Sequence, residues 1–275
     1  MLDHPAIKEF QKAVWDYYHQ NGRRFPWRET RDPYAILVSE IMLQQTQTER
    51  VVPKFLAWLD RFPTLESLAE ASLEDVLKLW IGLGYNRRAR FLRDAAQVIV
   101  TEHGGRVPQK ESDLDALPGI GRYTARAVAA FAFDKPSVII ETNIRAAFLW
   151  WFFPEQENIP DSDLEPFIAA AQDVPVRDWY YALMDYGSRL KKLVPNPSRR
   201  SRHHTVQSAF AGSRRQARGA ILRYLTHHGS ADLETVAASA AAESAPVEYG
   251  LLAEAASLLE SEGFITVSGT TVSLK

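Results

Sequence analysis

Apolar residues recur at helical spacing along almost the whole chain as far as about Ala220, and short runs containing glycine or proline interrupt the pattern. The main interruptions are NGRRFPW, RFPT, GLGY, HGGRVP, LPGIG and VPNPS. Because glycine and proline end helices, each interruption predicts a helix boundary. The pattern indicates an all-helical body, and 275 residues with 46% hydrophobic side chains are enough for two or three compact units.

The pattern changes near the C-terminus. Helices are predicted over residues 215–227, 232–242 and 246–261, and two alternating runs that flank Ser268 and Gly269 predict a β-hairpin with a two-residue turn. Three helices followed by a hairpin are typical of a winged helix. We therefore predict a mainly α fold in which a small winged-helix-like module covers residues 214–275.

Charge is segregated along the chain, although the net charge is only −2. Residues 176–223 contain 11 Lys and Arg against two acids, whereas residues 224–275 contain seven acids and one Lys. A basic run is usually a solvated face, but RLKKLVPNPSRRSRHH mixes bases with turn residues, which favours an anionic polymer as partner. The third helix of the module would read DNA in a DNA-binding winged helix, yet it carries acids and no base. We therefore expect the module to have a structural role or to contact another protein.

The chain contains no cysteine, which excludes disulfides, thiol catalysis, zinc–thiolate sites and a Cys-ligated iron–sulfur cluster. The paired histidines at residues 203–204 and 227–228 are poor metal ligands because adjacent side chains diverge. No apolar run approaches the roughly 20 residues that cross a bilayer, and the N-terminal sequence is unlike a secretory signal. The sequence predicts no metal, no membrane partner and a cytoplasmic location.

The segment LPGIGRYTA lies between two predicted helices. Gly119 and Gly121 permit a tight turn and leave amide N–H groups uncovered at the start of the second helix, where a phosphate is favoured. The segment is a candidate helix-hairpin-helix, and a plain interhelical turn is the alternative. A dinucleotide-binding fingerprint fits less well, because no strand precedes the segment and Thr124 replaces the third glycine.

Two acids interrupt apolar segments. Glu40 follows Ile36 and Leu37 by one helical turn, so it projects from the apolar face of its helix. It is either a buried partner of an arginine such as Arg28 or an acid whose pKa is raised by burial. Glu141 interrupts PSVIIETNIRAAF and can be a solvated helix-start residue, one half of a buried ion pair, or an acid kept for chemistry. Because it directly precedes a helix, exposed N–H groups and the helix dipole should favour its ionised form.

Two loops carry groups suited to nucleic acid. The run QQTQ, residues 44–47, ends the Glu40 helix with amide side chains that can reach base edges. The segment WIGLGYNRRAR combines a glycine turn, Tyr85 and several arginines, which suits a strand backbone and a stacked base. A core-packed tyrosine beside a solvated arginine face is the commoner explanation of such a segment taken alone.

Together these segments closely resemble the helix-hairpin-helix DNA glycosylases of the endonuclease III superfamily, and most closely the MutY-type adenine DNA glycosylases. The similarity runs from about Phe10 to about Leu190, and its most specific parts are FPWRETRDPY, SEIMLQQTQTERVVPKF, WIGLGYNRRAR, LPGIGRYTA and ALMDYG. The resemblance implies a glycosylase domain over residues 1–213, with a six-helix lobe at about 30–135 and a second lobe from 1–29 plus 136–213.

The resemblance also implies four catalytic residues. Glu40 would protonate the ring of the leaving base, and Glu141 would stabilise the cation that develops on the sugar. Tyr123 and Asn143 would assist at the sugar. Tyr123 stands where bifunctional members have a lysine, so we expect hydrolysis of the base without strand cleavage.

The same resemblance implies a set of DNA contacts. Gln45 and Tyr85 match residues that the family inserts into the opened base stack. The predicted contacts are Arg28, Gln44, Gln45, Thr46, Gln47, Gly82, Gly84, Tyr85, Arg88, Leu117, Gly119, Gly121, Arg122, Thr124, Lys191, Lys192, Arg199, Arg200 and Arg202.

Three departures separate this chain from the family pattern. The sugar-side acid is Glu141 rather than the usual Asp, and the four cluster cysteines that follow the ALMDYG helix in most members are absent. The C-terminal module does not resemble the domain that recognises 8-oxoguanine. We expect the basic loop in place of the cluster to contact the DNA backbone without a metal. No cofactor is expected, and a monovalent cation at the hairpin turn is left open.

Two carboxyl groups suit the hydrolysis of a glycosidic bond, because one can protonate the leaving group while the other supports the sugar cation. We expect a monofunctional DNA N-glycosylase of base excision repair that releases a flipped, mispaired or damaged base, with adenine as the first choice. The alternatives are a thymine or uracil mismatch glycosylase of the same superfamily and a non-catalytic DNA-structure-binding protein. The expected partner is double-stranded DNA, bound by a monomer in the nucleoid-associated cytoplasm.

Overall fold

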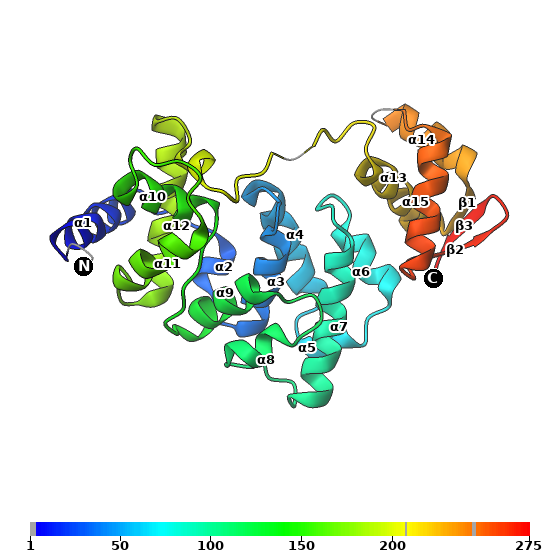
Figure 1. Cartoon of the computed structure of the whole chain (residues 1–275). Coiled ribbons are helices and arrows are strands. Elements are labelled where there is room, and N and C mark those ends of the chain that lie inside the picture. The colour runs from blue at the N-terminus through cyan, green and yellow to red at the C-terminus, as the bar shows by residue number, and fades with distance from the viewer. Residues whose placement is uncertain (1–3, 207, 244–245) are drawn as a thin grey trace. The chain divides into compact units, whose positions relative to one another are not determined.

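The computed structural model describes residues 4–206, 208–243 and 246–275. These residues are mainly helical, with one small sheet near the C-terminus (Figure 1). The chain divides into two compact units, which are described separately. No helix in the described ranges is long and apolar enough to cross a membrane.

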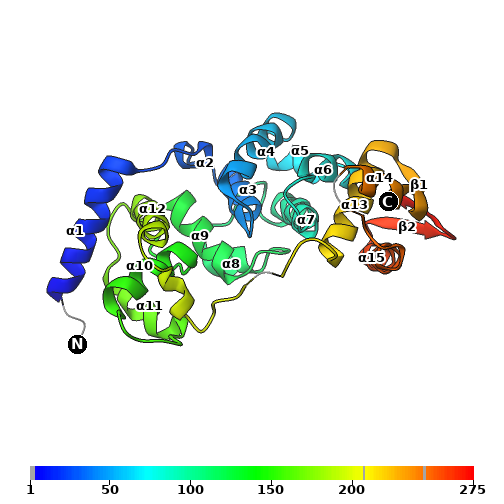
Figure 2. The same ribbon diagram turned by 90° about the horizontal axis from the view of Figure 1, so that it is seen from above.

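The first unit contains residues 1–40, 107–116 and 120–206. Its helices are α1 (His4–Asn21), α2 (Pro26–Glu29), the first part of α3 (Pro33–Leu43), α8 (Glu111–Asp115), α9 (Arg122–Phe133), α10 (Thr142–Phe152), α11 (Asp161–Ala170), α12 (Val176–Leu193) and the short 3₁₀ helix η1 (Pro197–Arg200). Helices α10, α11 and α12 lie together, as the view from above shows (Figure 2).

Aromatic rings fill the core of the first unit. Phe10 of α1 is fully buried, and its ring meets those of Phe148 at 4.9 Å, Phe152 at 5.3 Å and Trp179 at 6.0 Å between centroids. All three contacts are edge-to-face, the arrangement that aromatic quadrupoles favour. Phe10 thus fixes α1 against α10 and α12, the two helices that carry much of the candidate site.

Helix α12 passes so close to the start of α10 that only glycine fits at the crossing. A Cβ atom built on Gly187 would lie 1.9 Å from the carbonyl oxygen of Asn143 and 2.5 Å from its carbonyl carbon. These are backbone atoms in the first turn of α10, so they cannot rotate away as a side chain would. The glycine of the ALMDYG segment is therefore required by packing.

The second unit contains residues 41–106, 117–119 and 207–275. Its first part holds α4 (Thr48–Arg61), α5 (Leu65–Ala69), α6 (Leu73–Trp80) and α7 (Arg87–Glu102). Trp58 is fully buried in this part, with Trp80 at 5.5 Å and Phe62 at 5.2 Å between ring centroids. The units cut the chain at points other than the predicted lobe and module boundaries, since α9 packs against α12 and the C-terminal module packs against α6.

The C-terminal module has the predicted three helices and hairpin. Its elements are α13 (Arg214–His228), β1 (Ser230–Asp232), α14 (Leu233–Glu243), α15 (Tyr249–Ser261), β2 (Ile265–Ser268) and β3 (Thr271–Leu274). The sheet is antiparallel in the order β1-β3-β2. This is the order of elements of a winged helix.

The hairpin turn and the start of α15 differ from the prediction, whereas the ends of α13 and α14 lie within one residue of it. Ser268 pairs with Thr271, so the two-residue turn is Gly269 and Thr270 rather than Ser268 and Gly269. Gly269 has a φ of 60°, which a tight hairpin turn demands at its first central position and which glycine adopts without strain. Helix α15 begins at Tyr249, three residues later than predicted, because the backbone of Glu248 is still extended.

Glu262, just after α15, joins the module to α7 within the second unit. Its carboxylate accepts hydrogen bonds from Arg218 of α13 at 3.0 and 2.6 Å and from Arg87 of α7, and its backbone carbonyl accepts one from Arg90. Burial opposes ionisation of Glu262, but the hydrogen bonds from Arg87 and Arg218 outweigh burial, so its pKa lies below the ordinary value. The acidic side of the module is thus partly neutralised within the chain.

We predict that Gly187→Ala lowers the free energy of unfolding by about 1–3 kcal/mol, because the added methyl group must push the backbone of α10 away. Gly250→Ala is the matched control, since a Cβ at this exposed helical position meets no atom within 4 Å. The control should leave stability unchanged or raise it by up to about 1 kcal/mol. Urea titrations of the three proteins test this, and equal midpoints for Gly187→Ala and wild type would contradict the packing argument.

Candidate active site

Glu40 lies in the middle of α3 among apolar side chains, and it is 7% exposed. Its neighbours Leu37 and Ile41 are buried in the same helix. Burial and, to a smaller extent, the charge of Glu141 raise the pKa of Glu40, the charge of Arg28 lowers it, and the result is a pKa of about 8. The prediction that Glu40 projects from the apolar face is confirmed, and its carboxyl group keeps a proton at neutral pH.

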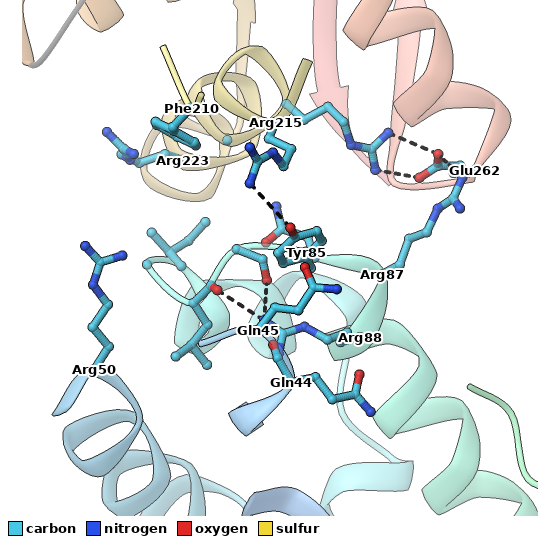
Figure 3. A pocket seen from close by; sticks show the side chains of 17 residues that line it. Gln44, Gln45, Arg50, Tyr85, Arg87, Arg88, Phe210, Arg215, Arg223 and Glu262 are labelled. Atoms are coloured by element: carbon cyan, nitrogen blue, oxygen red, sulfur yellow. Dashed lines mark hydrogen bonds and ion pairs between the residues drawn. The ribbon is translucent and has the colours of Figure 1, made fainter. Parts of the chain in front are cut away.

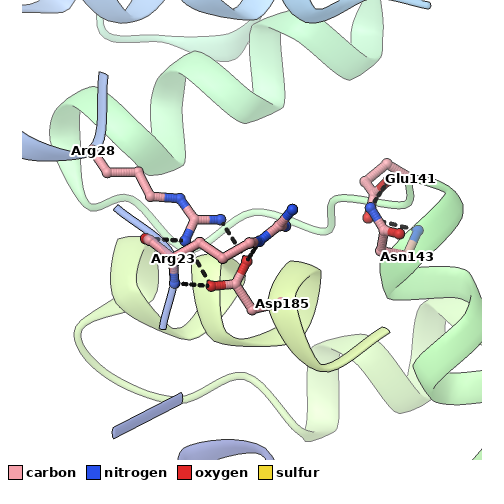
Figure 4. A network of polar contacts seen from close by, with 5 residues as sticks. All are labelled: Arg23, Arg28, Glu141, Asn143 and Asp185. Carbon is pink, nitrogen blue, oxygen red and sulfur yellow. Dashed lines mark hydrogen bonds and ion pairs between the residues drawn. The ribbon is translucent and has the colours of Figure 1, made fainter. Parts of the chain in front are cut away.

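Glu141 is the N-cap residue of α10. Its Oε1 atom accepts hydrogen bonds from the backbone N–H groups of Asn143 at 2.7 Å and Ile144 at 2.8 Å. Its Oε2 atom accepts a third hydrogen bond from Nδ2 of Asn143 at 3.2 Å (Figure 4). The carboxylate is therefore fixed at the positive end of the helix dipole.

The ionisation of Glu141 differs from the sequence-based expectation. Burial is the largest influence and raises the pKa above its ordinary value, although the two backbone hydrogen bonds and the charges of Lys191 and Arg145 act in the opposite direction. From the sequence we expected the start of the helix to favour the ionised form of Glu141, but that expectation did not include the effect of burial. The hydrogen bonds still distinguish Glu141 from Glu40, because they bind its charged form.

Tyr123, at the start of α9, completes the group around the two acids. Burial raises the pKa of its phenol well above the ordinary value, and the charges of Glu40 and Glu141 raise it further. Asn143 contacts Glu141 directly. The four residues predicted to be catalytic therefore come together, contributed by α3, α9 and the start of α10.

Arg28 does not form the ion pair with Glu40 that the sequence left open. Its Nη1 and Nη2 atoms each donate a hydrogen bond of 2.9 Å to Asp185, which also accepts from the backbone N and Nε of Arg23 (Figure 4). The guanidinium group lies 4.4 Å from the ring centroid of Tyr181. Arg28 is thus a buried structural partner of Asp185, and its field reaches Glu40 without a direct bond.

Sequence reasoning missed Asp185 and Arg23 as members of this site. Asp185 is 2% exposed on the buried side of α12. Burial alone would raise its pKa, but the hydrogen bond and charge of Arg28, with those of Arg23, bring the pKa below its ordinary value. The sequence signal that could have identified Asp185 was an acidic residue among the apolar residues of ALMDYG, at a position that a helix would bury. Its partners lie 157 and 162 residues away in the sequence, so spacing alone could not identify them.

The two predicted wedge loops belong to the second unit. Gln45 and Tyr85, both exposed, have φ values of 54° and 50°. Among the described residues only Asp134 and Asn158 share a positive φ without being glycine, and these two residue types tolerate it far better. Strained backbone at two non-glycine residues is typical of functional loops.

The other residues of these loops support that conformation. Gly82 and Gly84 have φ values of 97° and 72°. Gln44 and Thr46 are half-buried, and Gln47 is the exposed residue before α4. The loops therefore leave the side chains of Gln45 and Tyr85 exposed to solvent and keep their flanks anchored.

Arg88 holds the two wedge loops together. Its Nη1 atom donates to the carbonyl groups of Ile41 and Met42 at 2.8 and 3.1 Å, and its Nη2 atom donates to those of Leu83 and Gly84 at 3.1 and 2.9 Å. Burial lowers the pKa of this arginine to about 10. Its guanidinium group is occupied by the protein, so we expect Arg88 to shape the loops rather than contact phosphate (Figure 3).

The candidate hairpin joins α8 to α9. Gly119 has a φ of 70°, and a Cβ there would lie 2.3 Å from Cβ of Phe91, whereas Gly121 has an ordinary backbone and open space around it. Arg122 is exposed at the start of α9, while Leu117 and Thr124 are buried. Gly119 makes the turn, and it is exposed together with the other two predicted contacts that solvent can reach, Gly121 and Arg122.

The basic loop after α12 is attached to α10. Arg200 donates hydrogen bonds to the carbonyl groups of Leu149 at 2.8 Å and Phe153, at the C-terminal end of that helix. Lys191 is half-buried, and the exposed members of the predicted set are Lys192, Arg199 and Arg202. Within the described ranges no group of three or more His, Cys, Asp or Glu could hold a metal ion, and the residues of this cysteine-free loop do not fit a thiolate-bound cluster.

Comparison with known proteins identifies the matched segment. Residues 38–165 match the sequence profile of the HhH-GPD superfamily base excision DNA repair proteins. The adenine DNA glycosylase of Rattus norvegicus is 42% identical over 147 residues, which are 50% of this chain and 28% of the rat protein. That of Mycobacterium tuberculosis (strain CDC 1551 / Oshkosh) is 46% identical over 140 residues, which are 50% of this chain and 45% of the mycobacterial protein. The chain spans less than half the length of these two relatives.

A solved structure of a thermostable thymine-DNA glycosylase superposes with a TM-score of 0.61 at 28% identity, over 67% of this chain and 87% of that one. The fold is therefore that of the helix-hairpin-helix glycosylases. Residues 38–165 include Glu40, the hairpin and Glu141, so the segment matched by the profile is the one that builds the site. This segment, which is slightly less than half of the chain, thus matches the HhH-GPD superfamily of base excision DNA repair proteins.

Proposed function

We propose that this protein is a monofunctional DNA N-glycosylase that releases a mispaired or damaged base, with adenine as the preferred base. The observation that carries the proposal is the pairing of two carboxyl groups with different environments, Glu40 on an apolar helix face and Glu141 on a helix N-terminus. Such a division lets one group act as an acid and the other as a fixed anion.

Glu40 supplies the proton. At neutral pH its carboxyl group is protonated, since its pKa is about 8, and a purine ring nitrogen can accept that proton as the bond between the base and the sugar breaks. The bonding electrons leave with the base, and protonation prevents a full negative charge from building up on the ring. A pKa near the working pH combines a large protonated fraction with an acid that is still easy to deprotonate.

Glu141 supports the sugar. Three hydrogen bonds hold its carboxylate, so the charge does not need to reorganise when positive charge develops on the sugar. A water molecule then adds to the anomeric carbon, and one of its protons returns to the ionised Glu40, which restores the starting state. Tyr123 and Asn143 line the same site and orient these groups.

Three surfaces support DNA as the partner. The hairpin offers the exposed N–H side of Gly121 and the side chain of Arg122, and the basic loop offers Lys192, Arg199 and Arg202 for phosphates. Gln45 and Tyr85 stand on strained loops and would fill the stack that an extruded base leaves. The acidic residues after β1 stay a predicted contact for another protein.

Adenine is preferred over thymine because the relatives named adenine DNA glycosylase are 42% and 46% identical, whereas the thymine-DNA glycosylase is 28% identical. A protonated Glu40 also suits a purine, whose departure is assisted by ring protonation. The direct test is a single-turnover base-release assay on duplexes that carry adenine, thymine, uracil or a damaged base in defined mispairs. DNA binding without release of any base would favour the non-catalytic alternative.

We predict that the rate of base release falls as the pH rises above about 8, because only protonated Glu40 acts as the acid. Glu40→Gln should lower the rate by at least about a hundredfold and abolish this alkaline limb. The measurement is the single-turnover rate of both proteins at saturating enzyme across the pH range. A wild-type rate in Glu40→Gln would show that Glu40 is not the acid.

Stability gives an independent check of the same group. The pKa of Glu40 is higher in the folded protein than in the unfolded chain, where it is near 4.5. The contribution of protonated Glu40 to the free energy of unfolding is therefore fully present below pH 4.5 and is lost as the pH rises through about 8. The melting temperature of wild type should therefore fall relative to that of Glu40→Gln over this window. A constant difference between the two proteins would contradict the burial argument.

We predict that Glu141→Gln folds and binds DNA but loses base release by at least about a thousandfold, because a neutral amide cannot stabilise the sugar cation. Glu141→Asp should retain partial activity, since it keeps the charge on a shorter chain. Single-turnover release and melting temperatures of both variants are the measurements. If Glu141→Gln releases the base normally and only melts earlier, the carboxylate is a helix cap and the mechanism is wrong.

A further inference from the structure

A large pocket of about 1050 Å³ lies within the second unit, beside the two wedge loops. One wall is formed by residues 44–45 and 81–88, including Gln45 and Tyr85. The opposite wall comes from α13 of the C-terminal module and from Phe210, which precedes that helix (Figure 3). The proposed function uses the first wall and leaves the second without a role.

The pocket is lined by basic side chains. Helix α13 contains four arginines and no acid, and three of them, Arg215, Arg218 and Arg223, line the pocket with Arg50 from α4. Glu262 is the one acid among the lining residues, and it is bound by Arg218 and Arg87. The cavity therefore carries an excess of positive charge that suits an anionic ligand.

The second wall is connected to the wedge. Nη1 of Arg215 donates to the phenol oxygen of Tyr85 at 3.3 Å, and its guanidinium carbon lies 6.0 Å from the centre of the Tyr85 ring. Its Nη2 atom donates to the carbonyl group of Ser208 at 2.7 Å, so Arg215 is held at the pocket wall, but unlike Arg88 it is not buried. Arg88 lies 5.5 Å from the same ring. Tyr85 thus projects into a pocket between two arginines while its own backbone is strained. Phe210, 57% exposed, adds a second aromatic surface.

Aromatic faces among arginines suit single-stranded nucleic acid, because bases stack on the rings and phosphates contact the guanidinium groups. We propose that α13 is a DNA-binding element, with Arg215, Arg223 and Arg50 holding phosphates of the strand opposite the extruded base, and Tyr85 stacking on the base left unpaired there. This inference rests on the proposed function for the identity of that strand. It assigns DNA contact to the first helix of the module.

The acidic α15 agrees with this assignment. In a DNA-reading winged helix the third helix would enter the groove, but here α15 contains no basic residue, and its Glu254 is paired with Arg214 of α13 at 3.0 Å. The same module therefore has a basic helix and an acidic helix. The basic helix lines the pocket that also contains Tyr85, and Arg214, which is absent from the lining, faces the acidic helix.

The test compares the double variant Arg215→Ala, Arg223→Ala with the control Arg214→Ala, a neighbouring exposed arginine of the same helix. DNA affinity is measured by fluorescence anisotropy on a mispaired duplex over a series of salt concentrations. The double variant should bind at least about tenfold more weakly and lose about two from the salt slope, whereas the control should stay within about twofold of wild type.

Melting temperatures show whether each variant is folded, and Arg223→Glu alone serves if loss of Arg215 unfolds the module. The proposal is overturned if the folded variants bind DNA with the affinity and salt slope of the control. A contact with another protein would then be the remaining role for the module. A different result would contradict the proposed function, namely that the wild-type protein binds DNA but releases no base. In that case the loss of affinity in the double variant still supports α13 as a DNA contact.

Discussion

The free-energy cost of burying a carboxyl group determines how the residues around Glu40 are arranged. The apolar face of α3 keeps water from this group, which therefore holds its proton up to a pH of about 8. A direct ion pair with Arg28 would remove that proton. Arg28 does not form this ion pair because it binds Asp185 instead, whose carboxylate accepts hydrogen bonds from both Nη atoms of Arg28. The Arg28–Asp185 pair thus balances the positive charge of Arg28, which on its own lowers the pKa of the neighbouring Glu40.

Helix α12 explains why several requirements converge on the segment ALMDYG. Asp185 binds Arg28, and two residues later Gly187 lets the backbone of α10 approach closely enough to set the position of its first turn. Glu141 caps that turn, so its carboxylate is positioned by the same crossing of helices. The replacement of Asp by Glu at this position is compatible with the cap, because the longer side chain still reaches the N–H groups of both Asn143 and Ile144.

The elements and the main acids could be predicted from the sequence because they depend on local periodicity. The apolar neighbours of Glu40 located it on a buried face, and the module was recognisable from three helical patterns and an alternating hairpin. Long-range pairing was not predictable in this way: Arg88 looked like a DNA contact, yet it binds carbonyl groups at the end of α3 and in the 81–86 loop. The positive φ of Gln45 and Tyr85 also has no sequence signal, since neither residue type favours it. The proposed DNA contact of α13 was also not predicted from charge. The arginines of α13 were counted with the basic loop that precedes it, and the module was judged by the acids that follow them.

The basic loop after α12 is held in place by hydrogen bonds, in a chain that has no cysteine. Arg200 donates to the carbonyl group of Phe153, just after α10, and to that of Leu149 in its last turn, which also accepts from the backbone N–H of Phe153. A short parallel bridge between Ile159 and Ser201 holds the next residues, with hydrogen bonds of 3.0 and 2.9 Å on its two sides. Helix α10 is thus capped by Glu141 at its N-terminus and by Arg200 at its C-terminus, so the loop and the sugar-side carboxylate share one rigid element. A phosphate bound by the exposed Arg199 and Arg202 would be positioned relative to Glu141 by that helix, without a metal cluster.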